Sequence, residues 1–210
     1  MKKLLLALAL LTVVALLYYS LQSSPPAADP AAEAAYAQQL RQARQQKDRA
    51  FRAAPESPIP AEARAAFDGL RYFAPVAAYR VSARLSRAAA PAPLPLALSG
   101  GPGADAYARW GLAEFTLGGQ PQKLLLLQKQ GETSRLFVPF TDPTNGPRTY
   151  AGGRYLDLPV PAAEASEIAL DFNAAYNPFC AYNHAFSCPK PPAENRLTVA
   201  VEAGEQLYRP

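Results

Sequence analysis

The spacing of proline along the chain limits the secondary structure that it can form. The 210 residues include 22 prolines, whereas an average protein contains about 5% proline. Proline inside a helix removes a hydrogen bond and clashes with the preceding turn, so helices must fit between prolines. From Pro55 to Pro192 no proline-free stretch is longer than residues 103–120, and the longer stretch over residues 31–54 is also the one with helical composition. This spacing excludes a large helical bundle and a fold with many crossover helices.

Apolar and polar residues alternate with a period of two after residue 76, which is typical of half-buried strands. In residues 79–85, Tyr79 and Val81 begin an apolar series that alternates with arginine and serine. Gly118-Gly119 joins two such stretches and indicates a hairpin turn. The predicted strands are residues 79–85, 94–98, 106–117, 122–129, 135–140, 154–158, 167–172 and 196–202. We therefore predict an all-β domain, a single antiparallel β-barrel or sandwich of about eight short strands.

The N-terminus has the pattern of an export signal. Lys2 and Lys3 precede an apolar run over residues 4–21, which is long enough for a short membrane-spanning helix. No good cleavage site follows directly, so we expect an uncleaved signal anchor in the bacterial inner membrane; the alternative is a signal peptide whose cleavage releases the protein into the periplasm. Both place the rest of the chain outside the cytoplasm. The predicted domains are the anchor over residues 1–21, a linker over 22–32, a helical arm over 33–55 and a β domain over 56–210.

The formal net charge of +4 reflects a basic excess near the predicted membrane surface. The basic residues of the helical arm are Arg41, Arg44, Lys47, Arg49 and Arg52. They either contact anionic lipid headgroups or form a solvated helix face. Because the exported part is nearly neutral, we predict no nucleic-acid partner.

Residues 173–195 show no periodicity and interrupt the series of strands. A segment of this length without regular structure is unusual in a compact domain unless it is functional or disordered. It contains both cysteines, the single histidine and four prolines. This concentration of unusual residues makes the segment the first place to look for a site.

The two cysteines of this segment allow two interpretations. In an oxidising compartment, Cys180 and Cys188 are expected to form a disulfide that pins the loop. The alternative is a zinc site in which His184 and a fourth ligand, Glu194 or Asp171, join them, although zinc normally uses more closely spaced pairs. We predict the disulfide, no metal and no cofactor.

Several stretches resemble one known family. These are residues 136–146 (LFVPFTDPTNG), 149–156 (TYAGGRYL), 170–182 (LDFNAAYNPFCAY), 188–197 (CPKPPAENRL) and 203–205 (AGE), with looser similarity back to residue 57. They are similar to the family known as domain of unknown function 1684. The resemblance implies an exported bacterial domain, and the family has no established activity to transfer. Ala151 stands where the family usually has glycine, and His184 is not part of the family pattern.

Polar residues in and around residues 173–195 are candidates for binding a ligand. The predicted binding residues are Asp142, Tyr150, Arg154, Asp171, Asn173, Tyr176, Asn177, Glu194 and Asn195. Asparagine and tyrosine offer adaptable hydrogen bonds and amphipathic contact, as recognition surfaces do. The competing interpretation is that these side chains fasten the loop to the β domain.

We predict a membrane-tethered domain of the cell envelope that binds a ligand or another protein without catalysis. The expected partners are the membrane, through the N-terminal segment, and a polar small molecule, glycan or envelope protein. The alternative is an extracytoplasmic hydrolase that uses Asp171 and Glu194 or a bound metal. A third possibility is an envelope assembly factor. Residues 99–103 resemble an oxyanion-loop motif but are expected to form a turn, and no phosphate loop, dinucleotide fingerprint or haem motif is present.

Overall fold

The computed structural model describes residues 29–209. The chain divides into two compact units, Met1–Tyr36 and Ala37–Pro210. The described residues belong to the second unit, apart from residues 29–36. The predicted anchor over residues 1–21 and most of the predicted linker lie outside the described residues. Within residues 29–209, no helix is both long and apolar enough to cross a membrane.

One α-helix, α2 (Pro30–Ala53), precedes the β domain. The sequence predicted this helical arm over residues 33–55, so the helix begins three residues earlier and ends two residues earlier than expected. Proline suits the first turn of a helix, because its missing N–H has no partner there in any case. Near the C-terminal end of the helix, Phe51 is buried in a small apolar cluster with Phe67 and Tyr182. The Arg52 guanidinium donates to Phe67 O at 2.8 Å. The last two turns of the helix are therefore anchored to residues of the β domain.

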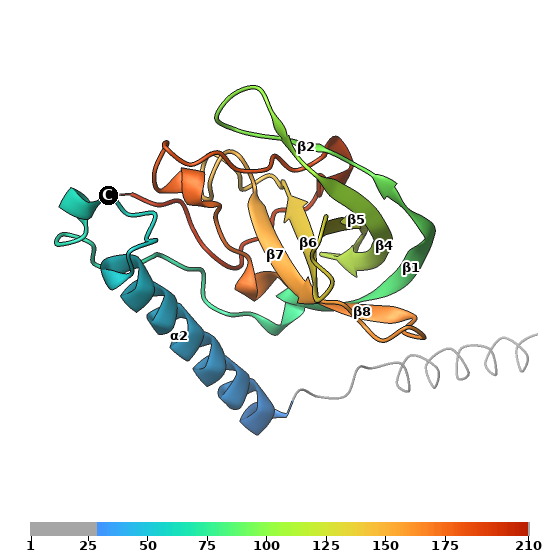
Figure 1. Cartoon of the computed structure of the whole chain (residues 1–210). Helices are drawn as coiled ribbons and strands as arrows, with labels where there is room; N and C mark the ends of the chain where they lie inside the picture. Colours follow the sequence, from blue (N-terminus) through green and yellow to red (C-terminus); the bar gives the residue numbers. More distant parts are fainter. Residues whose placement is uncertain (1–28, 210) are drawn as a thin grey trace, which may run out of the picture. The chain divides into compact units, whose positions relative to one another are not determined.

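The β domain is built on one curled antiparallel sheet with the strand order β7-β6-β5-β4-β1-β8 (Figure 1). Its strands are β1 (Arg80–Pro93), β4 (Tyr107–Leu117), β5 (Gln120–Lys129), β6 (Arg135–Phe140), β7 (Arg154–Pro159) and β8 (Glu167–Asp171). A separate two-stranded ribbon consists of β2 (Leu96–Ala97) and β3 (Ala104–Asp105). The two edge strands, β7 and β8, approach each other but are not paired. The sheet is thus a half-barrel, neither a closed barrel nor a sandwich.

The alternation in the sequence is the reason for this sheet. In β4, the side chains of Ala113, Phe115 and Leu117 are buried and lie on one face. The β4–β5 hairpin turns at Gly118 and Gly119, whose φ angles of +57° and +75° suit glycine. The predicted hairpin is present. The main core contains Ala83, Leu85, Leu124, Leu126, Leu136, Val138, Phe140, Leu156, Ile168 and Leu170, among others, from all six strands.

Two predicted strands differ from the structure. Residues 94–98 contribute only the short β2, and residues 196–202 form no strand. In the latter segment Leu197 and Val201 are buried and alternate with exposed residues, as predicted. However, the backbone N–H groups of this segment donate hydrogen bonds mainly to side chains. Val201 N, for example, donates to Asp142 Oδ2 at 2.8 Å. Period-two burial therefore predicted the buried face correctly, but it could not show that side chains replace a partner strand.

Five short 3-10 turns complete the described elements. They are η1 (Ala61–Ala63), η2 (Ala77–Tyr79), η3 (Phe172–Ala174), η4 (Phe179–Ala181) and η5 (Ala193–Asn195). The last three lie in or next to the irregular segment over residues 173–195. This segment is ordered by tertiary contacts rather than by regular secondary structure, and it forms part of the walls of the cavities described next.

Candidate functional site

The backbone of residues 173–195 is held against two strand edges. Tyr176 and Tyr155 of β7 exchange N–H···O bonds of 3.0 and 2.9 Å. Near the other end of the loop, Lys190 N donates to Ala97 O of β2 at 2.7 Å. The loop between these attachments lines two neighbouring cavities.

The larger cavity, called the aromatic cleft below, has a volume of about 360 Å³. Six aromatic residues line it: Tyr107, Phe137 and Tyr155 from the sheet, and Tyr176, Phe179 and Phe186 from the loop. The ring centroids of Phe137 and Tyr155 are 4.6 Å apart, and those of Phe137 and Tyr107 are 5.1 Å apart. Phe179 remains 41% exposed. The cleft is therefore a concave aromatic surface of the size that small-molecule sites normally have.

The cleft lies on the face of the sheet that is turned away from the main core. Phe137 of β6 is paired with Asp157 of β7, and both alternate with the core residues Leu136 and Leu158. Successive side chains of a strand point to opposite faces. The sheet therefore has apolar side chains on both faces, and the loop covers the second of them.

Charged residues at the mouth of the cleft form two ion pairs. Lys129 Nζ lies 3.3 Å from Asp105 Oδ2. Arg135 lies 3.5 Å from Glu132 Oε2. All four side chains are partly exposed, so the pairs contribute little to stability. They do place charge around an apolar interior.

A third carboxylate, that of Asp157, faces the tyrosines of the cleft. The Tyr176 hydroxyl donates to Asp157 Oδ2 at 2.9 Å. Burial and then the nearby Asp105 and Asp157 raise the pKa of Tyr107 to about 12. Burial and then Asp157 also raise the pKa of Tyr176. Both phenols are therefore neutral hydrogen-bond donors at physiological pH, in an environment that disfavours added negative charge.

The second cavity, called the thiol pocket below, has a volume of about 310 Å³. It is lined by Cys180 and Cys188, with Ser99, Tyr150 and Lys190 among its polar residues. Tyr155, Pro178, Cys188 and Pro189 line both cavities. The two cavities are therefore separated by one shared wall.

The predicted disulfide is absent from the structure, where Cys180 and Cys188 are free, buried thiols. Cys180 N donates to Cys188 Sγ at 3.2 Å, so the two residues are neighbours without a covalent bond. The Tyr150 hydroxyl lies 3.5 Å from Cys180 Sγ. Hydrogen bonding from Cys188 lowers the pKa of Cys180 to about 6, against the effect of burial. The same interaction, together with burial, raises the pKa of Cys188.

The alternative zinc site has no support in the geometry of the described residues. Across residues 29–209 no three or more histidine, cysteine, aspartate or glutamate side chains cluster as metal ligands. His184 is exposed. Glu194 forms an ion pair with Arg109 at 2.8 Å.

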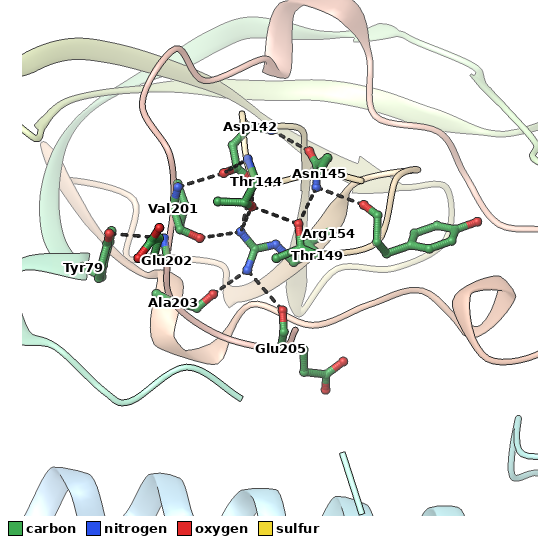
Figure 2. A network of polar contacts seen from close by, with 11 residues as sticks. Tyr79, Asp142, Thr144, Asn145, Thr149, Arg154, Val201, Glu202, Ala203 and Glu205 are labelled. Carbon is green, nitrogen blue, oxygen red and sulfur yellow. Dashed lines mark hydrogen bonds and ion pairs between the residues drawn. The ribbon is translucent and has the colours of Figure 1, made fainter. Parts of the chain in front are cut away.

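Two of the predicted binding residues, Asp142 and Arg154, belong to a buried polar network instead of a cavity wall (Figure 2). Their side chains form an ion pair of 3.1 Å and are both 0% exposed. The Arg154 guanidinium also donates to the carbonyls of Val201, at 2.8 Å, and of Ala203. Burial lowers the pKa of Arg154, and Asp142 opposes this effect. The network joins the start of β7 to the irregular C-terminal segment.

Asp171 and Asn173 fasten the end of β8. Asn173 N donates to Asp171 Oδ1 at 3.0 Å, which caps the turn η3. The Asn173 side chain accepts a hydrogen bond from Val76 N and donates one to Val76 O, both at 3.0 Å. These contacts agree with the interpretation of Asp171 and Asn173 as fastening residues.

Asn177 takes part in a second buried network, centred on Glu205. Asn177 N donates to Glu205 Oε2 at 2.8 Å, and the Tyr182 hydroxyl donates to the same oxygen. Lys47 of α2 forms an ion pair with Glu205 Oε1. The Glu205 side chain therefore connects the loop, the C-terminal segment and the helix.

Asn195 connects two strands of the sheet. Its side chain accepts a hydrogen bond from Leu125 N at 2.7 Å. It donates hydrogen bonds to Leu125 O at 3.1 Å and to Pro139 O at 2.8 Å. Since β5 and β6 share a short ladder, Asn195 replaces backbone pairing between them.

Of the predicted binding residues, Tyr176 lines the aromatic cleft and Tyr150 lines the thiol pocket. The two carboxylates proposed for a hydrolase, Asp171 and Glu194, line neither cavity. Asn173 and Tyr176 also line a smaller cavity of about 180 Å³ beside α2. A ligand-binding role for the remaining residues stays a prediction, and their contacts are those of fastening residues.

Sequence reasoning missed most of the aromatic cleft. Phe137, Tyr155 and Asp157 occupy the alternate positions of β6 and β7 that the pattern assigns to the outer face. Large aromatic side chains at such positions were a usable signal, because exposed apolar patches mark binding surfaces or further packing. Glu205 was included in a recognised stretch, but nothing in the sequence showed that Lys47 would pair with it.

Comparison with solved structures gives a close relative. The solution NMR structure of an uncharacterised protein from Haloarcula marismortui matches with a TM-score of 0.67 and 39% sequence identity. The match covers 85% of this chain and 97% of the other. No curated protein matches the sequence.

A family model matches residues 65–206, which include the whole sheet and every residue that lines either cavity. The description of that family is a protein of unknown function, DUF1684. The matched part covers well over half of the chain, and the chain therefore belongs to the DUF1684 family.

Proposed function

We propose that the β domain is a non-catalytic module that binds a small amphipathic molecule in the aromatic cleft. The observation that carries the proposal is the cleft of about 360 Å³, which six aromatic residues line. Sites for small molecules are concave, mostly apolar and provided with a few polar groups. The apolar body of the ligand would lie against Phe137, Phe179 and Phe186, and its polar group would reach Asp157 at the mouth.

Charge complementarity defines the polar group of the ligand. Lys129 and Arg135 are each paired with a carboxylate, whereas Asp157 accepts a hydrogen bond from the hydroxyl of Tyr176. A carboxylate beside tyrosine rings favours an ammonium group through ion pairing and cation–π contact. A ligand with an amine on an aromatic or aliphatic body fits these features.

The cleft can be tested with N-phenyl-1-naphthylamine, a neutral dye whose fluorescence rises in an apolar site. Two exposed large apolar side chains form a matched pair: Phe179, 41% exposed and in the cleft, and Val76, 45% exposed and outside its lining. We expect saturable binding of the dye and about a 10-fold weaker affinity for Phe179→Ala, because central aromatic anchors dominate binding energy. Val76→Ala should bind like the wild type.

Two results would contradict this proposal. One is the absence of saturable dye binding to the folded protein. The other is an equal affinity of Phe179→Ala and Val76→Ala, which would place the dye elsewhere. Circular dichroism of each variant confirms that the fold is retained.

We also propose that the module works outside the cytoplasm, tethered to the membrane by its N-terminal segment. The support is the sequence pattern of Lys2 and Lys3 before the apolar residues 4–21. In a bacterial host, alkaline phosphatase fused after residue 210 should be active, since the enzyme requires export, and the protein should sediment with membranes and retain Met1. An inactive fusion would contradict export, and a shortened N-terminus would favour the cleaved signal peptide.

A further inference from the structure

The thiol pocket contains two cysteines to which the proposed ligand binding assigns no role. Cys180 and Cys188 are 4% and 8% exposed, yet both line the pocket of about 310 Å³. Cys180 N donates to Cys188 Sγ at 3.2 Å, which keeps the two residues together in the reduced state. The two thiols therefore face a space that a reactant can enter.

The two thiols differ in their chemistry because their surroundings differ. The titratable groups around Cys180 are Cys188, Tyr155 and Tyr150, and the Tyr150 hydroxyl lies 3.5 Å from Cys180 Sγ. Hydrogen bonds from Cys188 and Tyr150 stabilise the Cys180 thiolate and lower its pKa to about 6, whereas the pKa of Cys188 is raised. The nucleophile and metal ligand of cysteine is the thiolate. At neutral pH, Cys180 is therefore the nucleophile of the pair and Cys188 remains protonated.

The lining of the pocket selects the charge of a reactant. Lys190 is the one residue with a cationic side chain among those that line it, and it is exposed. An exposed positive charge beside the pocket raises the encounter rate with anions and lowers it with cations. The pocket thus favours a reactant that carries carboxylates.

We propose that this pocket is a thiol–disulfide exchange site in which Cys180 attacks low-molecular-weight anionic disulfides and Cys188 resolves the product. The Cys180 thiolate attacks one sulfur of the disulfide R–S–S–R, so that a Cys180–S–S–R bond forms and RS⁻ leaves and takes up a proton from solvent. Cys188 then loses its proton and attacks Cys180 Sγ, which releases the second RSH. Overall, two cysteine thiols are oxidised to one disulfide and R–S–S–R is reduced to two RSH.

This inference goes beyond the proposed ligand binding and gives the absent disulfide a different role. In this proposal Cys180 and Cys188 form a reversible redox pair, and the free thiols of the structure are its reduced state. Because Cys188 also lines the aromatic cleft, the exchange would take place in the wall between the two cavities.

The test uses the full chain, reduced and separated from reductant, with glutathione disulfide as the anionic probe and cystamine as the cationic probe. Intact mass and peptide mapping follow the products. The wild type should become two hydrogens lighter and release two glutathione molecules. Cys188→Ser should retain one glutathionyl group on Cys180, and Cys180→Ser should react about 10-fold more slowly than Cys188→Ser, because its remaining thiol is mostly protonated. The wild-type rate should rise with a midpoint near pH 6.

The control for charge is Lys190→Ala, which should lower the rate with glutathione disulfide by about 3-fold or more and leave or raise the rate with cystamine. The exchange rates of the urea-unfolded chain with glutathione disulfide and with cystamine give the ratio of the two rates in the absence of the folded pocket. Equal rates for Cys180→Ser and Cys188→Ser, or a wild-type midpoint above pH 8, would overturn the assignment of the nucleophile. A native probe ratio equal to the ratio in urea would overturn the selection of anionic disulfides. The wild-type profile depends on no variant, so the proposal stays falsifiable if a variant fails to fold.

Discussion

Replacing Asp142 by asparagine tests the buried network most directly. One oxygen of the carboxylate accepts hydrogen bonds from Thr144 N at 3.1 Å and from Val201 N at 2.8 Å. The other oxygen accepts a hydrogen bond from Arg154 at 3.1 Å. Asparagine has nearly the same shape, but its NH₂ group must face either the two backbone N–H donors or the guanidinium. In both orientations Arg154, which is 0% exposed, loses its counter-charge.

The expected cost follows from the burial of this pair. Removing one partner of a buried ion pair costs about 3–5 kcal/mol, because the other charge stays buried without compensation. With a urea dependence of roughly 2 kcal/mol per molar, the unfolding midpoint should fall by about 2 M. Equilibrium urea unfolding followed by circular dichroism measures this shift.

The control is Glu164→Gln, which removes the same charge from an exposed turn and should change stability by less than about 0.5 kcal/mol. A double-mutant cycle with Arg154→Met should give a coupling free energy of about 2–3 kcal/mol. If Asp142→Asn costs less than about 1 kcal/mol, the network does not hold a charged arginine and the reasoning is refuted.

Three further predictions concern the loop, one turn and the cleft. Asn195→Ala removes three hydrogen bonds to the backbone of β5 and β6 and should lower the free energy of unfolding by about 2–3 kcal/mol in urea titrations; a loss below about 0.5 kcal/mol would contradict the bridging role. Gly153→Ala should lower the melting temperature, because φ is +94° and the new Cβ would lie 2.6 Å from the carbonyl oxygen of Phe140. The control Gly131→Ala should lower it less, because Gly131 also has a positive φ, +83°, but nothing lies within 4 Å of the new Cβ. Asp157→Asn should weaken binding of 1-naphthylmethylamine by about 5–10-fold and leave 1-naphthylmethanol unchanged in calorimetric titrations, whereas Glu164→Gln should change neither; equal effects on both probes would refute the preference for an ammonium group.

The core face of the sheet was predictable because it depends on local pattern. In β6 and β8 the alternate residues Leu136, Val138, Ile168 and Leu170 are buried, as a period of two requires. The glycine pair at the β4–β5 turn was predictable for the same reason, since a two-residue hairpin needs positive φ. Proline spacing correctly confined the long helix to residues that precede the β domain.

The candidate site was predictable only as a segment of the chain. Residues 173–195 were selected because they lack periodicity, and they do line both cavities. The assignment of individual residues was less successful, because the same residue types serve binding and fastening. Asn195 and Tyr176 are equally polar in sequence, but the first is bonded to the backbone of two strands and the second lines the cleft.

The sequence by itself determined which side chains of each strand face the core, where the hairpin turns and which segment is irregular, because these properties depend on neighbours a few residues apart. The tertiary structure decided what the outer face does. Phe137 of β6 and Phe186 of the loop line one cleft only because the sheet curls and the loop pairs with β7 and β2. It also decided that Cys180 and Cys188 meet as free thiols and that Lys47 pairs with Glu205. Lys47 and Glu205 are distant in the chain, and the geometry of both contacts depends on how all the strands pack together.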